Sequence, residues 1–151
     1  MARNRFTHTT SVEVALVAAT AKTVLQLVAP AAQRVAVSEA TISFDGISNT
    51  AEPVSVQVRR QTTAGTATAR APLRLDDDIA TALASTGQEN FTVEPTDSDI
   101  LATMEVHPQA GVIYQLPIPD GEIVIGAGDR LAIKATAPAA VNCLASFRGE
   151  E

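Results

Sequence analysis

Short apolar runs separated by turn-forming residues recur along nearly the whole chain, and this spacing constrains the fold more than any other feature. The clearest run is 53–60, where Val54, Val56 and Val58 alternate with polar residues, the period of a half-buried strand. Comparable runs follow one another roughly every ten residues, with proline, glycine and aspartate between them. About ten such strands predict an all-β, single-domain antiparallel β-sandwich of jelly-roll-like type over residues 11–151.

Three segments depart from the simple strand pattern. In residues 34–44 the apolar side chains first occupy odd positions, Val35 and Val37, and then even positions, Ile42 and Phe44. A regular strand would place these two pairs on opposite faces, so we predict a β-bulge near 38–40 that keeps them on one face. Asp78 can cap at most one short helix, near 78–85. Residues 1–10 are polar and unpatterned, so we predict a flexible N-terminal arm.

Near the C-terminal end, the run IVIGAG at 123–128 resembles the start of a dinucleotide-binding loop. The fingerprint G-x-G-x-x-G needs a third glycine and a following helix. Here the third position is Leu131, and the residues after it alternate with the period of a strand. We therefore predict a hairpin turn at 126–129 and no cofactor.

The remaining chemistry-bearing residues form no recognisable reaction centre. Asp76–Asp78 and the pair Asp97 and Asp99 could offer oxygen atoms to Ca²⁺, but neither continues into an EF-hand loop, and capping and turn formation account for both. Only two histidines are present and no G-x-S-x-G elbow. We predict no enzymatic activity and no metal.

Composition narrows the remaining classes of function. The single cysteine, Cys143, lies in an alternating run and is expected to be a buried hydrophobic residue. Aromatic residues make up 3% of the chain and tryptophan is absent, which disfavours glycan and single-strand nucleic-acid binding. The longest apolar stretch, 14–32, is interrupted by Lys22, Gln26 and Pro30, so no membrane span is predicted.

Charge is distributed unevenly along the sequence. Residues 1–75 carry eight bases and four acids, whereas residues 76–129 carry eleven acids and neither lysine nor arginine. Such asymmetry indicates charged partners, and a second copy of the chain is one of them. We therefore hypothesise a closed homo-oligomer in which basic strands of one subunit meet acidic loops of the next.

Five segments of the sequence carry a resemblance to known proteins: RQTTAGTATA (60–69), LRLDDDI (73–79), EPTDSDI (94–100), MEVHPQAG (104–111) and AGDRLAIKATAPAAVN (127–142). Together they resemble small proteins encoded among the virion genes of tailed bacteriophages, in particular head decoration (cement) proteins. The resemblance implies a β-rich, commonly trimeric subunit, made in the host cytoplasm, that sits on the capsid exterior and clamps neighbouring copies of the major capsid protein. A tail or baseplate module for receptor or glycan binding is the alternative.

For this assembly the sequence offers basic and acidic candidates for subunit contacts. The candidate interface residues are Arg3, Arg5, Arg59, Arg60, Arg70, Arg74, Asp76, Asp77, Asp78, Asp97 and Asp99.

Overall fold

The computed structural model describes residues 4–48, 52–76 and 81–151, and in these residues the chain is all-β, with thirteen strands and no helix. The strands form two sheets, in which every pairing is antiparallel. This arrangement confirms the predicted β-sandwich class; the strand order alone does not assign a jelly roll.

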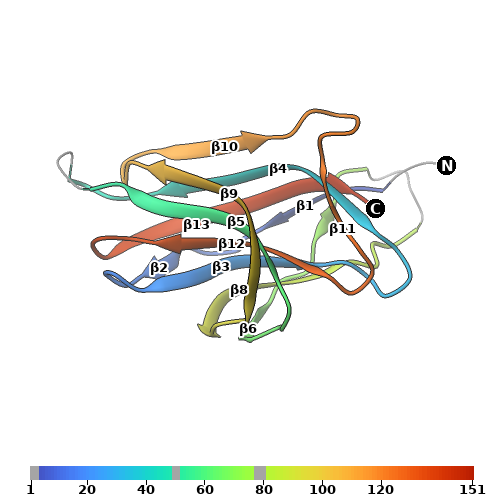
Figure 1. Cartoon of the computed structure of the whole chain (residues 1–151), viewed down its shortest axis with the longest axis horizontal. Coiled ribbons are helices and arrows are strands. Elements are labelled where there is room, and N and C mark those ends of the chain that lie inside the picture. The colour runs from blue at the N-terminus through green and yellow to red at the C-terminus, as the bar shows by residue number, and fades with distance from the viewer. Residues whose placement is uncertain (1–3, 49–51, 77–80) are drawn as a thin grey trace.

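Sheet A has seven strands in the order β10-β4-β13-β1-β7, with β11 also pairing with β4 and β2 with β13. Its strands are β1 (Arg5–Thr9), β2 (Val14–Leu16), β4 (Val35–Phe44), β7 (Leu73–Arg74), β10 (Gly111–Gln115), β11 (Ile123–Ile125) and β13 (Val141–Glu150). The first and last described residues lie side by side, with Asn4 and Glu151 exchanging two backbone hydrogen bonds of 3.0 Å (Figure 1).

Sheet B has six strands in the order β6-β8-β3-β12-β5-β9. Its strands are β3 (Ala21–Val28), β5 (Val54–Gln61), β6 (Thr66–Ala69), β8 (Thr86–Val93), β9 (Asp97–Val106) and β12 (Arg130–Thr136). One core, built from the facing sides of the two sheets, contains Phe6 and Phe147 of sheet A and Leu25, Leu131 and Ile133 of sheet B, each at most 1% exposed. Burial of this apolar surface is the main force holding the sheets together.

The predicted bulge in β4 is confirmed. Arg148 of β13 pairs with Glu39, and the next residue, Gly149, pairs with Val37, so Ser38 is the extra residue. The bulge returns Val37, Ala40 and Ile42 to the core side despite the change of parity in the sequence.

The N-terminal arm predicted for residues 1–10 is wrong for the residues that the structure describes there. Arg5–Thr9 is strand β1, inserted between β13 and β7, and Phe6 and His8 are fully buried. The segment RFTHT does alternate, but a histidine in an apolar position concealed the period. Residues 1–3 lie outside the described part of the chain.

Two further expectations change. Residues 81–85 are not helical, and the N–H groups of Ala84 and Ser85 donate to the carboxylate of Glu151 instead; the predicted cap, Asp78, lies outside the described residues. The turn at Gly126–Asp129 forms, with Asp129 N–H donating to Gly126 O over 3.0 Å. It joins β11 of sheet A to β12 of sheet B, so it is a crossing between sheets and not a hairpin.

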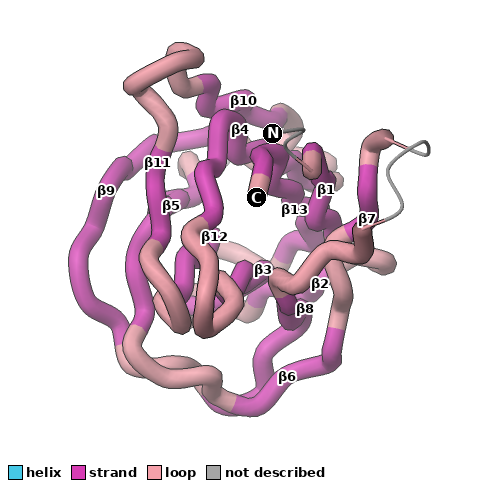
Figure 2. The backbone as a smooth tube through the Cα atoms, turned by 90° about the vertical axis from the view of Figure 1, so that its right-hand side faces the viewer, coloured by secondary structure: helices cyan, strands magenta, loops and turns pink. Residues whose placement is uncertain are grey.

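Two loops cross the outer face of sheet B, the face directed away from sheet A. One joins β5 to β6 and the other joins β8 to β9, and each passes from one side of the sheet to the other. They run side by side (Figure 2), bonded from Thr62 N to Thr96 O over 2.9 Å and from Thr96 N to Thr63 Oγ1 over 2.7 Å. The strands beneath them are β3 and β12.

Candidate functional site

A layer of polar side chains lies between the outer face of β3, β12 and β5 and the two crossing loops. Along β12, Ile133 points into the core and Lys134 points the opposite way, as alternation in a strand requires. Lys134 stands in register with Thr23 of β3 and Gln57 of β5. We call the following residues the polar layer: Thr23, Gln26, Arg59, Gln61, Glu94, Asp97 and Lys134.

Lys134 lies between two carboxylates at the centre of this layer. Its Nζ is 2.6 Å from Oδ2 of Asp97, the first residue of β9, and 3.3 Å from Oε2 of Glu94, in the loop that leads to β9. The side chains of Lys134, Asp97 and Glu94 are 11%, 23% and 34% exposed. A primary amine and two carboxyl groups are therefore held together, largely away from solvent.

The neighbours of these groups fix their orientation. Gln61 Nε2 donates to Oδ1 of Asp97 over 2.8 Å and to Thr23 Oγ1 over 2.9 Å. Glu94 is held by Thr23, whose backbone N–H and Oγ1 both donate to its carboxylate, the latter over 2.7 Å. Each carboxylate is thus positioned by hydrogen bonds independent of Lys134.

Asp97 has a lowered pKa. Desolvation by burial acts to raise it, but the hydrogen bonds from Lys134 and Gln61, together with the charges of Lys134 and Arg59, outweigh burial. Arg59 Nη1 lies 3.4 Å from Asp97 Oδ2. In this arrangement the carboxylate is the favoured form of Asp97.

A second group of polar residues lies inside the sandwich, where β1 meets β8. The His8 ring is fully buried against Gly87, and its Nε2 is 3.1 Å from the carbonyl oxygen of Gln26. Glu89, 3% exposed, accepts hydrogen bonds from the N–H and the hydroxyl of Ser11. Burial is the main cause that lowers the pKa of His8 to about 4.

The structure does not gather the candidate interface residues on one surface among the residues that it describes. Arg5 pairs with Asp76 through its Nε, 3.0 Å from Oδ2, and Arg59 pairs with Asp97, so these two pairs form within one chain. The side chains of Arg60, Arg70 and Arg74 donate to the carbonyl oxygens of Val124, Thr9 and Thr81, respectively. Asp99 is exposed on β9. Arg3, Asp77 and Asp78 lie outside the described residues.

Four acids of the segment 76–129 therefore have partners within the chain or lie in its interior. Asp76 is matched by Arg5, Glu94 and Asp97 by Lys134, and Glu89 is turned inward. Lys134 comes after the segment in sequence and Arg5 before it, which is why counting charges along the chain missed this compensation. No local signal in the sequence marks Lys134 and Glu94 as neighbours.

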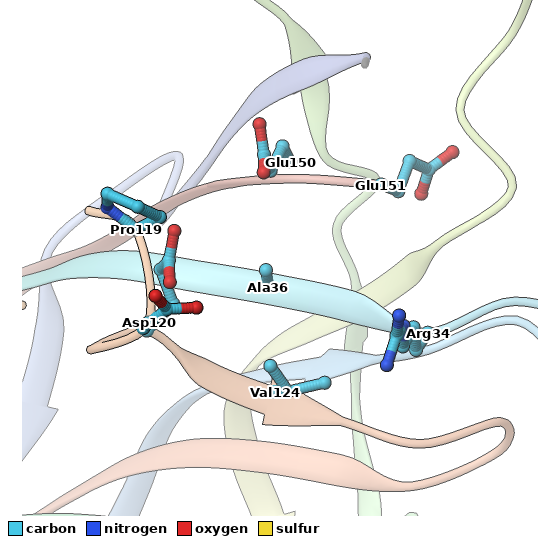
Figure 3. Close-up of a pocket in the computed structure, with 8 residues that line it drawn as sticks. Arg34, Ala36, Pro119, Asp120, Val124, Glu150 and Glu151 are labelled. Atoms are coloured by element: carbon cyan, nitrogen blue, oxygen red, sulfur yellow. The ribbon is translucent and has the colours of Figure 1, made fainter. Parts of the chain in front are cut away.

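An open hollow of about 470 Å³ lies on sheet A (Figure 3). Figure 3 shows Arg34 and Asp120 at opposite ends of it, with Ala36 and Val124 on its floor. Glu122, Glu150 and Glu151 complete the charged part of its wall. The carboxylate of Glu151 is already bonded to the N–H groups of Ala84 and Ser85.

The structure also bears on three other kinds of site among the described residues: a metal centre, a membrane span and a reactive thiol. Over residues 4–48, 52–76 and 81–151, no three His, Cys, Asp or Glu side chains are placed to hold a metal ion. In the same ranges, no helix has the length and apolarity needed to cross a membrane. Cys143 is 1% exposed, and burial raises the pKa of its thiol to about 12, which confirms the predicted buried residue.

Comparison with known proteins found no matching family model, no similar curated protein and no similar solved structure.

Proposed function

We propose that this protein is a structural, non-catalytic component of a tailed-bacteriophage virion that binds the outer surface of the capsid and stabilises it. The sequence phrases that resemble decoration proteins suggest this role, and the β-sandwich is compatible with it. The partner would be the major capsid protein, and the binding form a homotrimer.

The observation that carries the proposal is the set of large apolar side chains that the sandwich exposes. Large apolar residues are more than half exposed on several elements and loops: Ile47 (96%), Ile118 (68%), Val17 (64%), Ile113 (63%) and Val12 (60%). The buried centres of protein interfaces are apolar and depleted of charge, so side chains of this kind suit such a position. The partly buried ion pairs, by contrast, are satisfied within the chain.

Cryo-electron microscopy of the virus that encodes this chain tests the proposal. We expect density for the sandwich on the outside of the head shell, in contact with the major capsid protein. Density at the tail or baseplate would instead support the alternative of a receptor-binding module, and absence from the virion would refute both.

A further inference from the structure

We propose that Lys134 and Asp97 become joined by an intramolecular isopeptide bond, formed with the assistance of Glu94. The bond would connect Nζ of Lys134, in the middle of sheet B, to Cγ of Asp97, where edge strand β9 begins. The supporting geometry is the 2.6 Å approach of Nζ to Oδ2 of Asp97, with Oε2 of Glu94 3.3 Å from the same nitrogen.

Proximity makes the reaction feasible. Amines and carboxylic acids condense very slowly in water, but groups held at near-contact distance can react with effective molarities of about 10⁵ M or more. The backbone of Lys134 is fixed by pairing of β12 with β3 and β5 on either side. The carboxylate of Asp97 is fixed by the hydrogen bond from Gln61. The reacting atoms are therefore already oriented by the fold.

The reactive forms are the neutral amine and the neutral carboxylic acid. They arise when one proton passes from the Lys134 ammonium to Oδ2 of Asp97, which leaves the total charge unchanged. Restricted access of water lowers the cost of this transfer, because a neutral pair loses less on desolvation than an ion pair. Arg59, 3.4 Å from Oδ2, opposes the transfer, so we expect slow formation of the bond after folding.

The chemistry balances without any other reactant. Nζ attacks Cγ of Asp97 to form a tetrahedral centre, and Glu94 accepts a proton from the nitrogen. Glu94 then returns that proton to the departing Oδ2 hydroxyl, the Cγ–Oδ2 bond breaks, and one water molecule leaves. The amide that remains keeps Oδ1 as its carbonyl oxygen.

Gln61 has a positioning role in this reaction. Its Nε2 donates to Oδ1 of Asp97 over 2.8 Å, the oxygen on which negative charge develops in the tetrahedral centre. A donor already aimed at that oxygen stabilises the developing charge without reorganisation.

The inference stands apart from the proposed virion role, because the bond would form in the isolated chain. The mass of the purified protein therefore tests it whether or not the protein binds a capsid. The wild-type chain is expected to be lighter than its sequence mass by one water molecule after prolonged incubation at neutral pH.

Trypsin locates the bond, since the chain carries no lysine or arginine between Arg74 and Arg130. Asp97 lies in the tryptic peptide 75–130. Lys134, once acylated, is no longer cleaved and lies in 131–148. The expected product is these two peptides joined with loss of one water. A mass loss mapped to Glu94 in place of Asp97 would contradict the assignment.

Two variants complete the test. Lys134→Arg keeps a cation between the two carboxylates but cannot form the amide, and it should show the full sequence mass. Glu94→Gln retains Lys134 and Asp97 and should show the full mass, or a rate of water loss reduced at least tenfold. Full sequence mass in the folded wild-type protein would overturn the proposal and leave Lys134–Asp97 as an ion pair.

Discussion

The stability of this sandwich should depend on pH between 7 and 5 through one side chain, His8. Its ring is fully buried, and burial lowers its pKa from the ordinary value of 6.5 to about 4. The bond to Gln26 O and the charge of Glu89 act in the opposite direction, while the charge of Arg70 adds to the lowering. The net effect favours neutral histidine in the folded state.

The sign follows from proton uptake. As the pH falls below 6.5, the unfolded chain binds a proton at this histidine and the folded chain does not, so the free energy of unfolding decreases. With folded and unfolded pKa values of about 4 and 6.5, the loss between pH 7 and pH 5 is about 2 kcal/mol, and it levels off near 3 kcal/mol below pH 4.

The three aspartates with lowered pKa values do not contribute in this window. Asp45, Asp76 and Asp97 have pKa values lowered from 3.8, so the stability that they contribute is present above pH 4 and is lost only in stronger acid. The decline between pH 7 and pH 5 therefore reports His8.

Urea unfolding of the wild type, His8→Leu and His107→Gln at pH 7, 6 and 5 checks this reasoning. His107 is exposed, so His107→Gln serves as the control and should decline like the wild type. His8→Leu should show an almost flat free energy over the same range, whatever its absolute stability. A decline of about 2 kcal/mol retained in His8→Leu would refute the account.

Three further predictions concern packing and assembly. Gly87→Ala should destabilise the fold by about 1–3 kcal/mol in urea unfolding, because its Cβ would overlap Cε1 and Nε2 of His8 and lie 2.8 Å from Arg70 O; the same cost in a His8→Ala background would contradict this. Cys143 in the folded protein should react with a thiol reagent at least 100-fold more slowly than in urea, because it is buried; equal rates would contradict its burial. If the trimer is preformed, light scattering should give a mass of about three times 15.7 kDa. If the exposed β10 edge takes part in the contact, Ile113→Lys should lower that mass, and the control Thr103→Lys should not. A monomeric wild-type protein would refute the preformed trimer.

Local sequence patterns were sufficient to predict most strands of the sandwich. They failed where contacts between residues distant in sequence determine the structure. The alternation of Val54, Val56 and Val58 and the change of parity in β4 predicted their strands and the bulge, because each signal lies within one strand. Strand β1 was missed because the buried His8 conceals the alternation of Arg5–Thr9, and because its partner in the sheet, β13, is distant in sequence.

The charged residues show the same limit. Arg59 lies in the basic part of the sequence and Asp97 in the acidic part. This separation of charge suggested that such residues meet between subunits. The fold places them on neighbouring strands of sheet B, β5 and β9, within one chain. Lys134 and Glu94 were not singled out, because only the crossing of the β8–β9 loop over β12 makes them neighbours.

The placement of β12 and β13 has a consequence for how the chain folds during synthesis. β12 lies between β3 and β5 in sheet B, and β13 lies between β4 and β1 in sheet A. Both strands follow all the other described strands in the sequence, so neither sheet can close until they have been synthesised. Until then β3, β4 and β5 present unpaired edges, and unpaired edges are where chains aggregate. Nascent chains stalled before Arg130 should therefore remain protease-sensitive and depend on chaperones, and folding should follow as one late cooperative step.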